Sequence, residues 1–381
     1  MQFNLDFSIE FFLSLILILF PSAWNLLQFL YYKVSDYQDI VKRGNRKKIS
    51  IVTAIKGEEI LTVEEFLSNL SMQSFHDFEL IIVSDDEEDT LQKIKNLARK
   101  YDFAKVIKGN GKGRKAGALN LGVQASQNDT LLFLDVEARL ESDFMDKVSL
   151  LDCDAVAFKL KVREKFKNQL ERSYSAMTEF SMRSLFRGRS KLGLPIFPNG
   201  SSLLLKKEVL KKIGEFKEGS MAEDLEIGIR LFLSGIKVTY IQDPLIYTLS
   251  PPNVQSLVSQ LSRWAYGSGE LFSESFHMML GKGLRGIEGF LYVNQWGLYI
   301  LPFFVLGIDL LIAPLVSPLP FIVSLLIYVS LSIPTIYVNR NVNLSYGLPF
   351  YWALLKGYIK GLLHLKYEWK VTPKSEVRNP N

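Results

Sequence analysis

The sequence predicts an α/β fold: a catalytic domain with a mostly parallel sheet, joined to about three transmembrane helices and to amphipathic helices at the membrane interface. Three observations support this prediction. Short apolar runs alternate with amphipathic helical segments between residues 48 and 250, which is typical of a parallel sheet with right-handed crossovers. Two other stretches, 11–32 and 289–339, are almost free of charge. The mean hydropathy of the 381-residue chain is +0.11, which is high for a soluble protein.

Composition narrows the kinds of partner and metal site. The net charge is +5, and basic residues gather beside the apolar stretches, so we expect a membrane surface rather than a nucleic acid as the partner. The single cysteine, Cys153, excludes a disulfide within the chain and a thiolate metal site. The three histidines are scattered, so any metal is expected to be held by carboxylates.

The uncharged run at 11–32 contains about 22 residues, enough at roughly 1.5 Å per residue to cross a hydrocarbon core of roughly 30 Å. A cleaved signal peptide is the alternative, but no basic segment precedes the run and no small-residue cleavage site is evident. Basic residues follow the run, so the positive-inside rule places the amino terminus outside and the next domain in the cytoplasm. Residues 1–47 are therefore expected to be a transmembrane helix with a basic linker.

Residues 48–250 are expected to form one cytoplasmic catalytic domain. Strands are predicted at 49–55, 78–83, 104–108 and 130–134, and helices at 63–72, 91–101 and 116–125. These elements are followed by a charged helical stretch at 165–186, a segment at 198–205, a helix at 223–234 and a strand at 237–241.

The remainder of the chain is expected to return to the membrane. Residues 251–286 are predicted to be interfacial helices, with one amphipathic helix at 254–280. Residues 287–339 are predicted to be a transmembrane hairpin, broken by three prolines near position 317. The basic tail, 340–381, is expected to be cytoplasmic and amphipathic.

A wholly apolar run at 131–134 ends in Asp135, and Glu137 follows two residues later. Such a run is typical of a strand buried on both faces, and ligands bind at the carboxyl ends of strands in open α/β sheets. If the strand continues through the two acids, alternation points both carboxylates the same way. A converging pair would suit Mg²⁺ or Mn²⁺ with a substrate diphosphate, and the alternative is a strand end with two solvated acids.

Two loops at other strand ends contain groups suited to a nucleotide. The acidic run at 84–89 includes Asp85 and Asp86, which can accept from a nucleobase imide or a ribose hydroxyl. The run at 109–120 combines glycines with Lys112, Arg114 and Lys115 beside a predicted helix start, which favours phosphate. A solvated acidic surface and a flexible loop are the respective alternatives.

Two helices hold the other candidate groups. Glu223 and Asp224 begin a predicted helix, where such acids either cap the helix or supply a general base. Gln260, Arg263 and Trp264 stand at i, i+3 and i+4, which places them on one helix face. An amide, a guanidinium and an indole together suit a diphosphate beside a sugar ring, and a purely structural role is the alternative.

The order and spacing of these five groups resembles membrane-bound family-2 glycosyltransferases with the Rossmann-like GT-A fold, such as cellulose, hyaluronan and ceramide-type synthases. The resemblance covers residues 48–264 and includes a tail phrase, WKVTPK, at 369–374. It implies transfer of a sugar from a nucleotide-diphosphate sugar with Mg²⁺ or Mn²⁺ as cofactor.

The resemblance also implies roles for single residues, through base-binding acids, a K-A-G-A-L-N loop, a D-x-D pair, an E-D motif and Q-x-x-R-W. The implied donor-binding residues are Asp85, Asp86, Lys115, Asp135, Gln260 and Arg263; the metal ligands are Asp135 and Glu137; the acceptor-binding residues are Asn199, Gly200, Ser201 and Trp264; and the catalytic residues are Asp224, as general base, and Glu223.

Two departures from the family pattern concern the metal and the acceptor. The second acid of the pair is Glu137 instead of Asp, and its extra methylene changes its reach to a metal. The first strand ends in TAIKGEE at 53–59, a turn similar to that of ceramide glucosyltransferases, which favours a lipid acceptor.

We therefore expect an inverting glycosyltransferase of the cell membrane that moves a sugar, from a UDP-sugar by preference, to a lipid at the cytoplasmic membrane face. Its expected partners are the donor, the lipid acceptor and the bilayer, with no nucleic acid. About three spans can hardly enclose a channel for a polar polymer, which favours the lipid acceptor. A processive polysaccharide synthase is the alternative. A non-enzymatic transporter or scaffold is disfavoured, because Asp309 is the one ionisable group in the hairpin.

Overall fold

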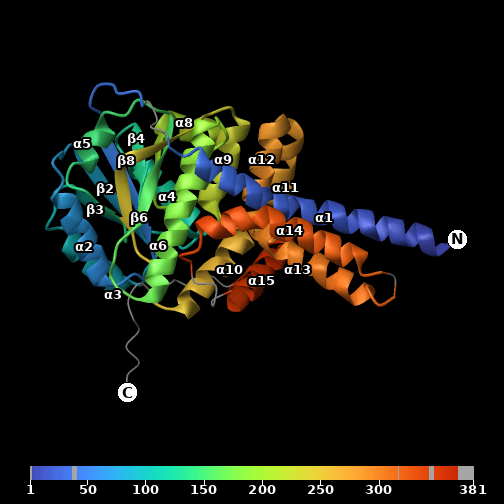
Figure 1. Cartoon of the computed structure of the whole chain (residues 1–381). Helices are drawn as coiled ribbons and strands as arrows, with labels where there is room; N and C mark the ends of the chain where they lie inside the picture. The colour runs from blue at the N-terminus through green and yellow to red at the C-terminus, as the bar shows by residue number, and fades with distance from the viewer. Residues whose placement is uncertain (1, 37–40, 316, 343–346, 368–381) are drawn as a thin grey trace, which may run out of the picture.

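The computed structural model describes residues 2–36, 41–315, 317–342 and 347–367. A sheet covered by helices forms one end of the molecule, and long helices extend from the other end (Figure 1). The α/β class, the mostly parallel sheet and the long apolar helices agree with the sequence prediction.

Eight strands form one sheet in the order β3-β2-β1-β4-β7-β6-β8-β5. Their bounds are Ile49–Ile55 (β1), Phe78–Ser84 (β2), Ala104–Lys108 (β3), Thr130–Phe133 (β4), Arg139–Leu140 (β5), Ala155–Val162 (β6), Leu203–Lys206 (β7) and Val238–Thr248 (β8). Strands β1 to β4 are parallel, as are β6 and β8, whereas β7 and β5 run antiparallel to their neighbours. The carboxyl ends of β1, β2 and β4 therefore meet at one edge of the sheet.

Strand β4 is buried on both faces, as its apolar run predicts. Leu131 and Phe133 belong to a core shared with α4 (Arg114–Ala125) and α9 (Glu223–Leu233). Leu132 and Leu134 belong to the core on the opposite face, with α2 (Ile60–Ser71) and α3 (Glu88–Ala98). Alternate side chains of one strand thus anchor it between two helical layers, which fixes the position of the acids that follow.

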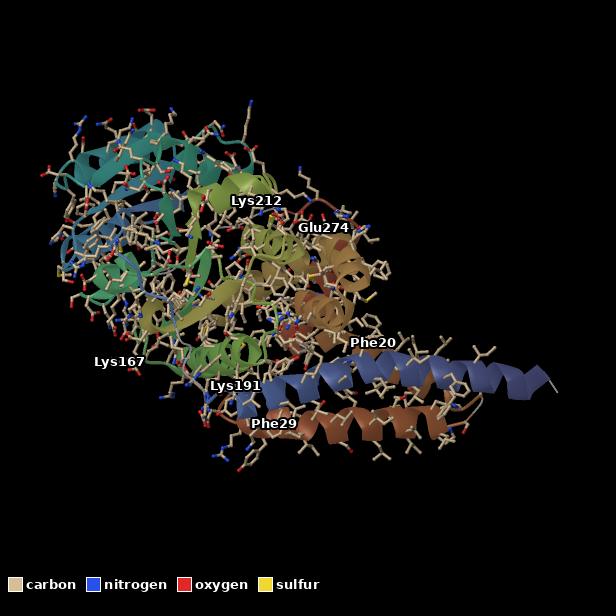
Figure 2. The ribbon with its side chains drawn as sticks, turned by 90° about the horizontal axis from the view of Figure 1, so that it is seen from above. Phe20, Phe29, Lys167, Lys191, Lys212 and Glu274 are labelled. Carbon is tan, nitrogen blue, oxygen red and sulfur yellow. The ribbon has the colours of Figure 1, made fainter. Side chains whose placement is uncertain are left out.

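Three helices of the described chain are long and apolar enough to cross a membrane. They are α1 (Gln2–Lys33), whose apolar part is Phe11–Lys33, α13 (Gln295–Ile312) and α14 (Leu319–Val338). Helix α1, marked by Phe20 and Phe29, runs beside α14 away from the sheet (Figure 2). Most of the α14 surface is exposed apolar side chain, as expected for a lipid-facing helix.

Shorter helices join the sheet domain to the long ones: α10 (Val254–Glu270), α11 (Phe272–Gly281), α12 (Gly283–Val293) and α15 (Gly347–Leu362). Glycines bring α15 against α10, because a Cβ at Gly357 would lie 2.2 Å from the Ser262 carbonyl oxygen and one at Gly361 would lie 2.1 Å from that of Tyr266. The helix with the Q-x-x-R-W residues is therefore braced by the amphipathic tail.

The structure corrects four details of the prediction. The amphipathic segment at 254–280 is broken near Leu271 into α10 and α11. Strand β4 ends at Phe133 instead of residue 134. Strand β8 continues past residue 241 to Thr248, because it pairs along β6. The charged stretch at 165–186 contains α6 (Gln169–Ser181) and then a π-helix, η1 (Met182–Gly188). The tail phrase at 369–374 lies outside the described residues.

Candidate active site

The carboxyl ends of β1, β2 and β4 open into one large cavity of about 1880 Å³. The residues that line it include every site residue predicted from the sequence: Asp85, Asp86, Lys115, Asp135, Glu137, Asn199, Gly200, Ser201, Glu223, Asp224, Gln260, Arg263 and Trp264. Lys56 and Glu58, in the turn after β1, also line it. Residues separated by up to about 180 positions in the chain thus share one site, and their individual roles stay predictions.

The acids after β2 organise the loops that line one part of the cavity. Asp86 Oδ1 accepts from the Gly57 amide at 2.6 Å, which ties the β1 turn to β2, and Asp85 Oδ1 accepts from the Gly111 amide at 2.9 Å. A Cβ at Gly109 would lie 2.0 Å from Asp85 Oδ1, so a side chain at this position would displace the Asp85 carboxylate. The acidic run is therefore a built part of the cavity wall and not simply a solvated surface.

Lys115 lies in the first turn of α4 and connects two of the acidic groups. Its Nζ is 2.8 Å from Asp135 Oδ1 and 2.9 Å from Glu223 Oε1. Burial opposes the charge on this lysine, but the two carboxylates outweigh it and raise the pKa of Lys115 above its usual value. The cation therefore fixes the end of β4 relative to the start of α9.

Asp135 and Glu137 are presented by a turn, which corrects the premise that the strand continues through them. The Ala138 amide donates to the Asp135 carbonyl at 2.9 Å and closes this turn. The buried Arg139 side chain donates to the carbonyls of Val136 and Ala138, each at 2.8 Å. The sequence argument missed Arg139, although a basic residue two positions after Glu137 is the signal that marks it.

Arg139 is held in turn by α2, through a 2.8 Å ion pair between its guanidinium and Glu65 Oε2. The buried guanidinium therefore shapes the backbone on both sides of Glu137.

Asp224 sits at the start of α9 with both carboxylate oxygens hydrogen-bonded to backbone. Oδ2 accepts from the Gly200 amide at 2.7 Å, and Oδ1 accepts from the Leu225 amide at 2.8 Å. Burial first, and the neighbouring Glu223 carboxylate second, raise the pKa of Asp224 from 3.8 to about 6, with Lys115 opposing them. A carboxylate in this state is ionised at neutral pH and is a stronger base than an ordinary aspartate.

The loop containing Asn199, Gly200 and Ser201 packs against this carboxylate. A Cβ at Gly200 would lie 3.2 Å from both Asp224 Oδ2 and Lys115 Nζ, tighter than ordinary contacts. Glycine therefore allows the loop amide to approach the acid closely.

Helix α10 contributes another part of the cavity wall. Trp264 packs near Trp296 of α13, with ring centroids 5.8 Å apart. Within the described chain, the buried Gln260 Oε1 and Asn199 Nδ2 have no hydrogen-bond partner, and both residues line the cavity. One acceptor and one donor are thus left for a bound polar group.

The acid pair fits a divalent ion shared with a substrate. Among the described residues, no group of three or more His, Cys, Asp or Glu side chains is placed to hold a metal alone. Asp135 and Glu137 both line the cavity, and each carboxylate has two oxygens. Mg²⁺ and similar ions are commonly held by one or two carboxylates together with substrate phosphates and water, so this donor set is suitable.

The fold and the cavity define a GT-A-like glycosyltransferase. Residues 131–358 match the model of glycosyl transferase family group 2, and residues 13–150 match that of chondroitin N-acetylgalactosaminyltransferase. The first match covers more than half of the chain, and the protein belongs to glycosyl transferase family group 2.

Named relatives span several acceptor classes. A probable glycosyltransferase of Sulfolobus acidocaldarius is 29% identical over 98% of this chain and 88% of its own length. A beta-monoglucosyldiacylglycerol synthase of Trichormus variabilis is 26% identical over 62% of this chain, and a poly-beta-1,6-N-acetyl-D-glucosamine synthase of Staphylococcus epidermidis is 25% identical over 56%. The matches cover 52% and 53% of these last two relatives.

A solved structure with the same fold is that of a mannosyltransferase from Pyrobaculum calidifontis in complex with GDP-Man and Mn²⁺. It superposes with a TM-score of 0.62 over 93% of this chain and 100% of its own, at 17% sequence identity. This likeness confirms the GT-A-type fold.

Proposed function

We propose that this glycosyltransferase transfers a sugar, with inversion, from a nucleotide-diphosphate sugar to a lipid acceptor at the cytoplasmic face of a membrane. The observation that carries the proposal is the position of Asp224. Its carboxylate lies in a cavity that begins at the strand ends and continues between the helices long enough to span a bilayer. A base so placed can meet a donor from one side and a membrane-held acceptor from the other.

In the proposed reaction, Asp224 takes the proton of the acceptor hydroxyl as its oxygen bonds to the anomeric carbon. The bond from that carbon to the nucleotide diphosphate breaks on the opposite face, which inverts the configuration. Lys115 and Arg263 offset the negative charge that develops on the departing diphosphate. A divalent ion held by Asp135 and Glu137 would supply Lewis-acid stabilisation of the same charge.

For the donor, we propose a UDP-sugar. The carboxylates of Asp85 and Asp86 line the cavity and can accept from the imide of uracil. The relative solved with GDP-Man makes guanosine diphosphate sugars the first alternative to test.

For the acceptor, a membrane lipid agrees with the number of long helices. The described chain has three helices suited to span a bilayer, too few to surround a channel for a polar polymer. A glycerolipid, a sphingolipid-like lipid or a polyprenyl phosphate needs no such channel. The match to a beta-monoglucosyldiacylglycerol synthase supports this class, while the match to a polysaccharide synthase keeps a processive synthase as the second candidate.

The deciding experiment incubates the purified full chain with a panel of UDP- and GDP-sugars, a native lipid extract, and Mn²⁺, Mg²⁺ or EDTA. Nucleotide diphosphate and sugar in the organic phase are measured in the same samples. The proposal expects release of one nucleotide, an equal amount of sugar in the lipid phase, and loss of both with EDTA. Sugar in an aqueous polymer would support the synthase, and no release with any donor would refute the proposed enzyme.

A further inference from the structure

The membrane side of the active-site cavity has a polar wall. Residues of α1, α13 and α14 also line the cavity, and eight of them have amide or hydroxyl side chains. Five of these eight hydrogen-bond to one another between helices. We call these five the neutral wall: Asn25, Gln28, Tyr299, Tyr328 and Ser332. Polar groups are rare on membrane helices unless they contact one another or a ligand.

Hydrogen bonds hold the neutral wall in place. Asn25 Nδ2 donates to Ser332 Oγ at 2.8 Å, and the Tyr299 hydroxyl donates to Gln28 Oε1 at 3.0 Å. The Tyr328 hydroxyl interacts with both Asn25 and Ser332. Amide and hydroxyl groups have more donor and acceptor sites than these bonds use, so the wall can also bind a ligand.

The cavity opens toward the bilayer between α13 and α14. Phe303 of α13 and Ile333 and Ile336 of α14 line the cavity, yet their side chains are 52%, 55% and 54% exposed. Residues that are both lining and exposed mark the rim of an opening. Apolar rim residues on such helices suit a lipid whose headgroup enters the cavity while its hydrocarbon chains stay in the bilayer.

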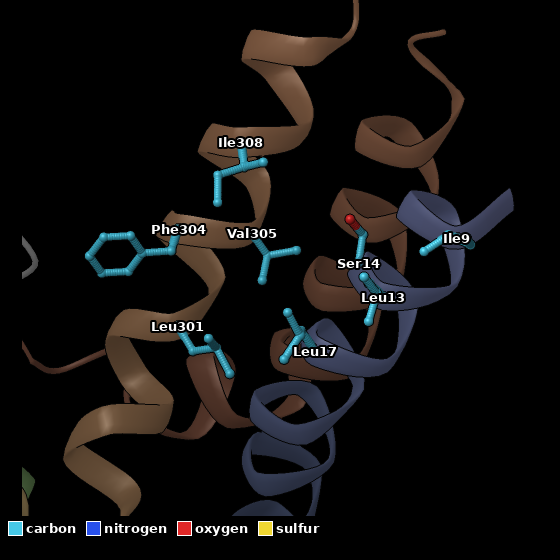
Figure 3. Close-up of a pocket in the computed structure, with 8 residues that line it drawn as sticks. All are labelled: Ile9, Leu13, Ser14, Leu17, Leu301, Phe304, Val305 and Ile308. Atoms are coloured by element: carbon cyan, nitrogen blue, oxygen red, sulfur yellow. The ribbon is translucent and has the colours of Figure 1, made fainter. Parts of the chain in front are cut away.

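A second cavity farther along α1 has a different character. It measures about 430 Å³ and lies between α1 and α13, where Figure 3 shows Leu13 and Leu17 facing Leu301 and Val305. Its lining is apolar apart from Ser14. Polar side chains thus gather where the membrane cavity continues into the active site.

All lining residues that α1, α13 and α14 contribute to the active-site cavity are uncharged, and the basic Arg340 follows only after the end of α14. A phosphate at the depth of the neutral wall would be held without a cation there, which is unfavourable. The chemistry of the acceptor supports the same conclusion. An acceptor hydroxyl needs a base such as Asp224, whereas an acceptor phosphate oxygen is already ionised and would be repelled by that carboxylate.

We propose, on the basis of the function proposed above, that the acceptor is an uncharged lipid with a hydroxyl-bearing headgroup, which enters between α13 and α14 and is held by the neutral wall. The glycerolipid and sphingolipid-like classes meet this description, and a polyprenyl phosphate does not.

The test uses the full chain in phosphatidylcholine vesicles that contain either diacylglycerol or a polyprenyl phosphate at equal mole fraction. Ile333→Trp narrows the opening. Gln28→Leu with Tyr299→Phe removes both members of one hydrogen-bonded pair, so that neither is left facing a lost partner, and Gln295, which also accepts from Tyr299 at 3.4 Å, remains on the cavity lining. The matched control is Leu326→Trp, on the same helix, 61% exposed and outside the cavity lining. Lipid KM, donor affinity and melting temperature are measured for each.

We expect transfer to diacylglycerol well above that to the polyprenyl phosphate. We also expect a rise of about tenfold in the KM for diacylglycerol in the rim variant Ile333→Trp and in the double variant of the neutral wall, but not in the control. Faster transfer to the polyprenyl phosphate would overturn the proposal. So would a fall in melting temperature with an unchanged lipid KM, because the wall would then only join the helices. Absence of nucleotide release in every vesicle would instead refute the proposed enzyme.

Discussion

At the scale of the residue, Asp224 is a carboxyl group whose surroundings oppose its ionisation while two backbone amides orient it. Replacement by the isosteric amide tests whether this group removes the acceptor proton. We expect Asp224→Asn to lower the transfer rate by about 10²–10⁴-fold, the usual contribution of a general base. The measurement is nucleotide release and product formation at saturating donor and lipid.

The control for this variant is Asp89→Asn. Asp89 is an exposed aspartate of the acidic run at 84–89 and does not line the cavity. Asp224→Asn loses one backbone hydrogen bond, but it also removes a carboxylate whose ionisation burial disfavours, so its melting temperature at neutral pH should change little. Near-normal transfer by a folded Asp224→Asn protein would contradict the base assignment.

The pH dependence follows from the same residue. The fold raises the pKa of Asp224 to about 6, so the base is ionised above that pH and protonated below it. We expect kcat/KM for transfer to fall about tenfold per pH unit below about pH 6 and to level off above it. The residual rate of Asp224→Asn should lack this limb. Stability changes with the opposite sign, because protonation of this group favours the folded state. That contribution is fully present below about pH 3.8 and is lost as the pH rises to about 6.

At the scale of the element, a buried ion pair connects the long apolar helix α1 to the loop whose amide donates to Asp224. Arg189, directly after the π-helix η1, makes two contacts with Glu288 of α12, at 2.7 and 2.8 Å, and Tyr31 of α1 donates to the same carboxylate at 3.3 Å. The Arg189 guanidinium stacks on Tyr292, 4.1 Å from the ring centroid, and Tyr292 stacks on Phe197 at 4.9 Å.

Phe197 precedes the loop of Gly200 and packs beside α9 near Gly228, one turn after Asp224. Arg189 is therefore a positioning residue for this loop. Glycine at 188 lets α1 approach, since a Cβ there would lie 2.1 Å from the Tyr31 carbonyl oxygen. Helix α1, the π-helix and the loop of Gly200 thus form one packed unit.

Breaking this pair should be costly, because it leaves a buried charge alone. We expect Glu288→Gln or Arg189→Met to lower the unfolding free energy by about 3–5 kcal/mol, and the double variant Arg189→Met with Glu288→Leu to lose much less than the sum. Unfolding in detergent measures all three. Glu88→Gln, which breaks the exposed pair with Lys108, is the control and should change nothing measurable. Additive losses in the double variant would show that the two residues act independently.

At the scale of the whole molecule, the sheet domain and the long helices present two different surfaces. The sheet domain is surrounded by charged side chains, and α1, α13 and α14 expose mainly apolar ones (Figure 2). We propose an orientation with the sheet domain in the cytoplasm and the turn between α13 and α14 outside, because basic residues follow α1 and α14 on the sheet side.

Cysteine labelling in sealed vesicles from cells tests this orientation. In a Cys153→Ser background, an impermeant maleimide should label Leu315→Cys, in the turn after α13, from the outside. Lys191→Cys, exposed on the sheet side, should react only after permeabilisation. The reverse pattern would place the catalytic domain outside.

The sequence by itself predicted the elements whose pattern is local. β1 and β3 agree with their predicted bounds, and the long apolar helices were recognisable because burial between two layers and burial in hydrocarbon both require continuous apolar runs. The motifs also determined which residues line the cavity, since strand ends in a parallel sheet meet at one edge.

Tertiary structure alone decided how those residues are held. The ion pair of Arg139 with Glu65, the close approach of Gly200 to Asp224 and the Arg189–Glu288 pair all join segments distant in the chain, and no local periodicity encodes such contacts. The neutral wall belongs to the same class, because isolated polar residues on apolar helices acquire meaning only when three helices bring them to one cavity.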